Sequence, residues 1–287
     1  MKLGAKAYLR KMGFQFDKTP VKLDRLFYTS LSDDGRRAFE RYSAVAPQYK
    51  NIKDLLQIPE TAKQAARLFS SDANRYVASM ECMDAIFGSL KSGSVLDMGC
   101  GAGFLIDYLS QKHSDFSFEG LESQNNLARV ASKITDKHIY NLNYITDLPL
   151  NDFDYVICEF GWDRSDIANG AAPHDLHEIE GHQYCSGCSE AAEKSYEIMI
   201  RSWEKWLSKN GQLIVMGRLG TIGDVKALLI AANKNGLVLA SEYSRWLYWK
   251  HDGEEQRAPA LTFQRGEPKK VDAIMQDAAG IFQLIKH

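Results

Sequence analysis

The chain has 287 residues, of which 45% are apolar and 25% charged, an ordinary composition for a folded protein of one large domain or one domain with an addition. Its formal net charge of −2 argues against broad electrostatic binding to nucleic acid. No stretch approaches the roughly 20 apolar residues of a transmembrane segment. The five cysteines show no disulfide pattern, which favours reduced thiols and a cytoplasmic location.

The first 90 residues (1–90) are predicted to form a helical cap that contributes to the substrate site. Within 61–87, apolar residues recur at alternating spacings of four and three, as on one face of a helix: Tyr76, Met80, Met83 and Phe87. The opening segment is helix-like and basic, with Lys2, Lys6, Arg10 and Lys11. This pattern is typical of a helix packed on its own domain, and also of an amphipathic helix in weak peripheral contact with an anionic membrane.

From residue 91 onward, strands and helices alternate, which predicts a second domain over 91–287. The predicted strands are 94–98, 116–121, 138–144, 154–158, 212–216 and two strands of a hairpin within 237–264. Repeated β–α units predict an α/β fold, with a Rossmann-like, mostly parallel sheet of seven strands, helices on both faces and a C-terminal antiparallel hairpin. The helix expected before the fifth strand spans 190–209 and ends at Asn210 and Gly211, a typical C-cap.

A glycine-rich turn follows the first of these strands, in the sequence Asp97-Met98-Gly99-Cys100-Gly101-Ala102-Gly103. A strand, a glycine turn and a helix are the usual nucleotide-binding corner of an open α/β sheet. The dinucleotide pattern G-x-G-x-x-G does not fit, because the third glycine comes one place early and Phe104 occupies the expected position. Asp97 would also repel a pyrophosphate, whereas it suits a positively charged ligand such as S-adenosylmethionine.

This turn resembles motif I of the class I S-adenosylmethionine-dependent methyltransferases, and the resemblance covers about 94–265. It implies that Glu122, 25 residues after Asp97, accepts hydrogen bonds from the two ribose hydroxyls. It further implies that Asp147 and Leu148 contact the adenine, and that Glu159 lies near the methionine end or the substrate. The full set of cofactor-binding residues implied by the resemblance is Asp97, Gly99, Cys100, Gly101, Gly103, Glu122, Ser123, Asp147, Leu148 and Glu159.

The segment 160–189 has no sustained periodicity and is expected to be a long insertion loop, rich in histidine and cysteine. Three interpretations are open. His174, His177, His182, Cys185 and Cys188 have spacings compatible with a zinc site. Alternatively, His174 or His177 is a general base for a hydroxyl acceptor, with Asp163 as its orienting acid, or the histidines are simply exposed. The catalytic residues assigned are His174, His177 and Asp163, and no metal ligand is assigned.

The function expected from these features is methyl transfer from S-adenosylmethionine to an oxygen of a small molecule or sugar in a biosynthetic pathway. The Asn/Asp-Pro-Pro-Tyr/Phe signature of amino-methylating DNA enzymes is absent, and the paired glutamates of arginine methyltransferases are not evident. Nucleic acid bases and arginine are therefore not favoured as acceptors. The alternatives are a protein or peptide methyltransferase, a non-catalytic S-adenosylmethionine-binding partner subunit, and a nicotinamide dehydrogenase.

Overall fold

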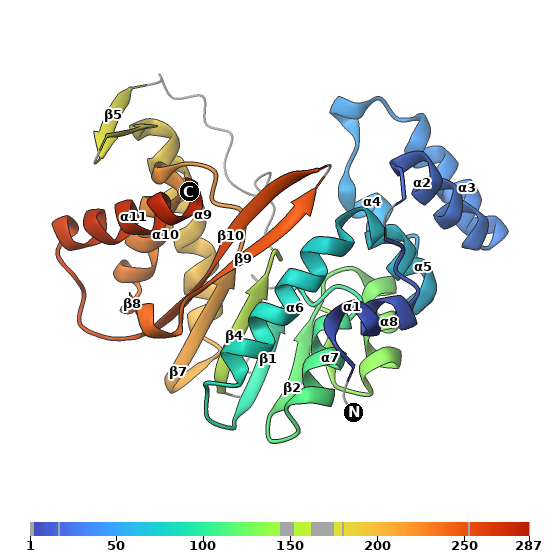
Figure 1. The fold of residues 1–287 in the computed structure, drawn as a ribbon, viewed down its shortest axis with the longest axis horizontal. Helices are drawn as coiled ribbons and strands as arrows, with labels where there is room; N and C mark the ends of the chain where they lie inside the picture. Colours follow the sequence, from blue (N-terminus) through green and yellow to red (C-terminus); the bar gives the residue numbers. More distant parts are fainter. Residues whose placement is uncertain are drawn as a thin grey trace. The chain divides into compact units, whose positions relative to one another are not determined.

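The computed structural model describes residues 3–16, 18–143, 152–161, 175–179, 181–251 and 253–286 (Figure 1). The chain divides into two compact units that alternate along the sequence. Unit 1 comprises Met1–Gly88, Gly99–Asn143 and Tyr248–Gln256, and unit 2 comprises Ser89–Met98, Tyr144–Leu247 and Arg257–His287. Within the described ranges, no helix combines the length and the apolar character needed to cross a membrane.

The described residues of the N-terminal part of unit 1 form the helices α1 (Ala5–Met12), α2 (Pro20–Ser30), α3 (Asp33–Ala44), α4 (Ile52–Leu56), α5 (Ala62–Leu68) and α6 (Ala73–Phe87). Their boundaries follow local signals. Pro20 begins α2, the Ser32 hydroxyl accepts the Gly35 N–H at the start of α3, and Thr61 and Gln64 form a capping box on α5. The short 3₁₀ helices η1 (Pro47–Tyr49) and η2 (Phe69–Asp72) connect them. The predicted N-terminal helices are thus confirmed.

Helix α1 is an integral part of the core of unit 1. Leu9 is completely buried, and the Tyr8 hydroxyl donates to Asp107 Oδ2 at 2.7 Å. The buried ring of Phe14 packs edge-on against Phe104, with centroids 5.1 Å apart. Phe104 is the first residue of α7 (Phe104–Lys112), directly after the glycine turn. The basic side chains of α1, at Lys6, Arg10 and Lys11, are exposed, as expected for a helix packed on its own domain.

The main sheet has the strand order β3-β2-β1-β4-β7-β10-β8, with β9 paired to β10. In unit 1, β2 (Ser117–Leu121) is parallel to β3 (Ile139–Tyr140), and α8 (Asn125–Thr135) connects them. In unit 2, β1 (Ser94–Met98), β4 (Phe153–Glu159) and β7 (Leu207–Met216) are parallel neighbours. Strand β10 (Glu254–Arg265) is antiparallel to β7 and to β8 (Leu237–Leu239), and β9 spans Arg245–His251. This confirms the predicted mostly parallel α/β sheet with antiparallel C-terminal strands.

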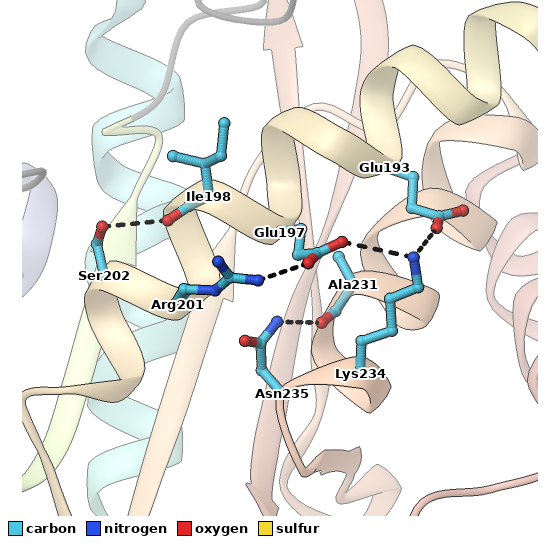
Figure 2. Close-up of polar contacts among 8 residues, drawn as sticks. All are labelled: Glu193, Glu197, Ile198, Arg201, Ser202, Ala231, Lys234 and Asn235. Atoms are coloured by element: carbon cyan, nitrogen blue, oxygen red, sulfur yellow. Dashed lines mark hydrogen bonds and ion pairs between the residues drawn. The ribbon is translucent and has the colours of Figure 1, made fainter.

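Helices α9 (Ser186–Glu204) and α10 (Ile222–Lys234) lie against each other in unit 2, and α11 (Val271–Lys286) follows the sheet. Buried Tyr196 and Trp203 form the inner face of α9. On the outer face, Lys234 Nζ lies 2.7 Å from a Glu193 carboxylate oxygen and 3.4 Å from one of Glu197 (Figure 2). Glu197 also pairs with Arg201, so this one carboxylate contacts a cation of its own helix and Lys234 of α10.

The structure corrects the predicted helix over 190–209 at both ends. Helix α9 begins at Ser186 and ends at Glu204, and after a two-residue turn the chain enters β7, where Leu207 pairs with Phe153. Gly211 is therefore not part of a helix C-cap. It lies inside β7 at a shift in the register with β4, where a Cβ atom would come within 2.9 Å of the Phe153 carbonyl oxygen.

The described part of 160–189 is also more regular than predicted. Strands β5 (Leu176–Ile179) and β6 (His182–Cys185) form an antiparallel hairpin, and Gly181 in its turn has a positive φ of 78°. Helix α9 follows immediately, because the Cys185 sulfur accepts the Cys188 N–H at its N-cap. The described part of this segment is thus a hairpin and a helix start rather than a loop.

Candidate functional site

The glycine turn of unit 1 is fastened to the end of strand β2. Gly99, Gly101 and Gly103 have φ angles of 77°, 55° and 78°, a region that residues with a side chain rarely adopt. The N–H groups of Gly99 and Cys100 both donate to the Leu121 carbonyl oxygen, at 2.8 and 3.0 Å. The turn therefore has a fixed position beside the residue that follows Leu121.

Two of these glycines meet different surroundings. Among the described residues, no heavy atom lies within 4 Å of a Cβ atom placed on Gly101, so this position borders open space. A Cβ atom on Gly103 would lie 3.0 Å from Ala131 Cβ and 2.9 Å from Thr135 Cγ2, both on α8. Gly103 thus permits close packing of helix α8, whereas Gly101 leaves room beside the turn for another molecule.

Glu122 places a buried carboxylate next to this open position. Its side chain is 7% exposed, Oε2 accepts the Gly101 N–H at 2.9 Å, and Oε1 accepts the Gln124 N–H at 2.7 Å. Burial raises the pKa of the Glu122 carboxyl, and the two N–H donors act in the opposite direction. Each carboxylate oxygen can accept a further hydrogen bond, so Glu122 can receive both hydroxyls of a ribose diol. Glu122 therefore lies at the glycine turn, at the end of β2.

The loop after β2 is held by polar contacts that the sequence reasoning missed. Asn141 Nδ2 donates to the Glu122 carbonyl oxygen at 2.8 Å, and Gln124 Nε2 donates to the Ser123 hydroxyl at 3.1 Å. Gln57 Nε2, at the end of α4, donates to Gln124 Oε1 at 2.7 Å. These bonds hold the loop that carries Glu122 and Ser123. No periodicity or motif in the sequence indicates them.

In unit 2, Asp97 and Glu159 occupy the carboxyl ends of parallel strands. Asp97 is 2% exposed and pairs in register with Ile157 of β4. Glu159 is half-buried and is the last residue of β4. Phe160 follows with a positive φ of 50°, and its N–H donates to the Met216 carbonyl oxygen at 2.8 Å. Non-glycine residues in this conformation often mark functional sites, which draws attention to this end of β4.

Cys158 precedes Glu159 and is not a candidate nucleophile. Its thiol is buried, and burial raises its pKa strongly, with a further contribution from Asp97. The thiolate form that reacts is therefore suppressed at neutral pH.

Of the predicted catalytic residues, the structure describes only His177, and His174 and Asp163 lie outside the described residues. Asp147 and Leu148, predicted to contact the adenine, also lie outside them. His177 is exposed on β5, and its Nε2 lies 2.8 Å from Asp175 Oδ2. Asp175, two residues earlier, is thus an acid partner that the sequence reasoning did not identify.

The cysteines of this segment have a structural role in the described part of the chain. Cys185 caps α9 through its contact with the Cys188 N–H at 3.3 Å. Among the described residues, no group of three or more His, Cys, Asp or Glu side chains is arranged to hold a metal ion. The zinc interpretation therefore has no support in the described segment.

No family model and no curated protein matches the sequence. Among solved structures, the chain is similar to the O-MT segment of StiE, with 13% identity over 85% of this chain and 91% of that chain and a TM-score of 0.48. It is similar to the magnesium protoporphyrin IX methyltransferase of Synechocystis PCC 6803, with 13% identity, coverage of 88% and 100%, and a TM-score of 0.42. A TehB-like S-adenosylmethionine-dependent methyltransferase of Corynebacterium glutamicum is 17% identical, with coverage of 66% and 88% and a TM-score of 0.41.

At these identities the similarity concerns the fold alone. By its own strand order, the chain is an α/β protein with a Rossmann-like, mostly parallel sheet.

Proposed function

We propose that this protein binds S-adenosylmethionine and transfers its methyl group. The observation that carries the proposal is the hydrogen bond from the Gly101 N–H to the buried Glu122 carboxylate, beside the open space at Gly101. A carboxylate in this position fits a ribose diol. Asp97, two residues before Gly99, is a buried acid that suits the positive charges of the methionine end.

The remaining cofactor contacts follow the resemblance. Gly99, Cys100 and Gly103 complete the turn, Ser123 lies next to Glu122 in the sequence, and Glu159 is proposed to face the methionine end or the acceptor. Asp147 and Leu148 are proposed to contact the adenine.

For the acceptor, we propose a hydroxyl of a small molecule or sugar. The bound cofactor supplies an electrophilic methyl group, and the protein has to remove the hydroxyl proton. The imidazole of His177 is a suitable general base. With Asp175 accepting a hydrogen bond from Nε2, the tautomer is fixed so that Nδ1 carries the lone pair that receives the proton. Asp175 thereby orients the ring and stabilises the imidazolium that forms. His174 and Asp163 are retained as further candidates for this role.

Calorimetry with S-adenosylhomocysteine, S-adenosylmethionine and NAD tests the proposed cofactor. We expect the first two to bind and NAD to show no binding. Glu122→Ala should weaken binding at least tenfold, since removing one partner leaves buried donors unpaired at a cost of about 1–3 kcal/mol. Asp115→Ala, which changes an exposed acid shortly before β2, is the matched control. Binding of NAD, or unchanged affinity in Glu122→Ala, would contradict the assignment.

Transfer of a labelled methyl group to a panel of hydroxyl, amine and peptide acceptors tests the acceptor. Labelling of hydroxyl compounds supports the proposal. Labelling of peptides would identify a protein or peptide methyltransferase instead. Cofactor binding with no transfer to any acceptor class would favour a non-catalytic cofactor-binding subunit.

A further inference from the structure

The end of helix α4 is hydrogen-bonded to the loop that holds the candidate ribose carboxylate. Gln57, the C-cap residue of α4, donates from Nε2 to Gln124 Oε1 at 2.7 Å. The Gln57 carbonyl oxygen accepts a hydrogen bond from Asn126 Nδ2. Side chain and main chain of one residue are therefore both held by a segment 67 to 69 positions later in the chain.

Gln124 continues this contact to the carboxylate and to the glycine turn. Its side chain is largely buried, and its amide is fixed from both ends, by Gln57 at Oε1 and by the Ser123 hydroxyl at Nε2. Its backbone N–H donates to Glu122 Oε1 at 2.7 Å, and Glu122 Oε2 accepts the Gly101 N–H. A series of three hydrogen bonds thus runs from α4 through Gln124 and Glu122 to the turn.

The segment before Gln57 has little burial to hold it in place. All residues of 43–54 are exposed, including the apolar Val45 (40%), Tyr49 (77%) and Ile52 (45%). Beyond them, half-buried Leu55 and buried Ile58 join a small cluster around Phe27 and Leu31. Because few apolar contacts support residues 51–57, the polar contacts at Gln57 carry a large share of the stability of this helix end.

We propose that Gln57 is a positioning residue that couples occupancy of the nucleoside site to the order of residues 51–58. The inference rests on the proposed function, because it takes Glu122 to hold the ribose. A ligand that fixes Glu122 also fixes the Gln124 N–H that bonds to it, and a fixed Gln124 side chain holds α4 through Gln57. Linkage makes the effect reciprocal, so that loss of the Gln57 contact weakens the nucleoside.

Hydrogen exchange of the full chain with and without saturating S-adenosylhomocysteine tests this coupling. In the unmodified protein we expect the ligand to slow exchange in 99–104 and also in 51–58. In Gln57→Met, the slowing in 51–58 should be lost while that in 99–104 remains. The affinity for S-adenosylhomocysteine should fall about threefold to tenfold, the range of one intramolecular hydrogen bond.

Four further variants separate positioning from general stability. Gln124→Met also removes the bond to Ser123 and should bind at least as weakly as Gln57→Met. The double variant should be no weaker than Gln124→Met, because both changes remove the bond between Gln57 and Gln124. Gln57→Lys keeps a donor of sufficient reach and should restore the affinity. Gln48→Met, the same change at an exposed glutamine of η1, is the matched control and should bind normally. Gln57 is itself exposed, so the variants at position 57 are expected to fold, and thermal melting checks the folding of these and of the Gln124 variants.

Each contrary result has a distinct meaning. If the ligand binds and slows exchange in 99–104 but not in 51–58, the coupling is refuted and the proposed function stands. Equal affinities for Gln57→Met and Gln48→Met, or additive effects of Gln57→Met and Gln124→Met, also refute it. If S-adenosylhomocysteine does not bind the unmodified protein at all, the proposed function and the coupling both fail.

Discussion

Alanine substitutions at Gly101 and Gly103 should separate ligand binding from stability within one turn. Both positions have positive φ, so a side chain at either costs roughly 1–2 kcal/mol. At Gly103 the added methyl group would also lie 3.1 Å from Ala131 Cα, a backbone atom of α8 that cannot move alone. Overpacking of this kind costs about 1–3 kcal/mol. We therefore expect Gly103→Ala to lose roughly 2–5 kcal/mol in the free energy of unfolding, against roughly 1–2 kcal/mol for Gly101→Ala.

For ligand binding we expect the opposite order, with Gly101→Ala losing more affinity than Gly103→Ala. The methyl group of Gly101→Ala projects into the open space beside Glu122, and we expect at least a tenfold loss of S-adenosylhomocysteine affinity. Urea unfolding followed by circular dichroism measures the free energy of unfolding, and calorimetry on the folded protein measures the affinity for S-adenosylhomocysteine. Equal stability of the two variants would show that Gly103 does not pack against α8 as described. Normal affinity in Gly101→Ala would show that the open space does not receive the ligand.

Three further predictions concern titration, catalysis and surface charge. Burial raises the pKa of Glu122, so its carboxylate takes up a proton at a higher pH than an ordinary carboxylate does. The affinity for S-adenosylhomocysteine should therefore begin to decline at a higher pH as the pH falls. Calorimetry from about pH 8 to about pH 5 measures this, and an affinity that does not change over this range would contradict it. The Glu122 carboxyl then holds its proton more tightly in the folded state than in the unfolded state. Its contribution to the free energy of unfolding should therefore decrease as the pH rises through the raised pKa, and Glu122→Gln should remove this pH dependence. His177→Asn should lower kcat by about 10²–10⁴ with unchanged cofactor affinity, and a normal kcat would exclude His177 as the base. Lys234→Met removes the pairs with Glu193 and Glu197 and should cost less than about 1 kcal/mol because Lys234 is half exposed, a loss that should shrink in about 1 M salt.

The parts of the fold that the sequence predicted well are those specified by local pattern. The strand ending at Met98, the glycine spacing and the apolar face of α7 all lie within a short stretch, so the strand, turn and helix were recognisable together. The distance of 25 residues from Asp97 to Glu122 reflects one β–α–β unit of ordinary length, which is why the carboxylate could be placed without a structure.

The parts that failed depend on partners far away in the chain. Trp206 and Leu207 continue the apolar spacing of α9, and Asn210-Gly211 has the composition of a helix C-cap, so local reasoning extended the helix. Pairing with Phe153, more than 50 residues earlier, instead makes Leu207 the first residue of a strand. The Gln57 contact with Gln124 is of the same kind, since two glutamines separated by 67 positions leave no periodic signal.

The way α1 is buried has a consequence for synthesis of the protein. Tyr8 bonds to Asp107, 99 positions later, and Phe14 packs on Phe104. Helix α1 also packs on α5 and α6, and the Phe14 ring contacts Tyr76, so this part of its binding surface is made earlier. The part that α7 supplies is made only about a hundred residues after α1, which takes roughly 5–20 s at ordinary translation rates. During that interval the Tyr8 hydroxyl and the Phe14 ring lack their partners on α7. The core of unit 1 is thus completed only when α7 packs onto a segment made much earlier in the chain.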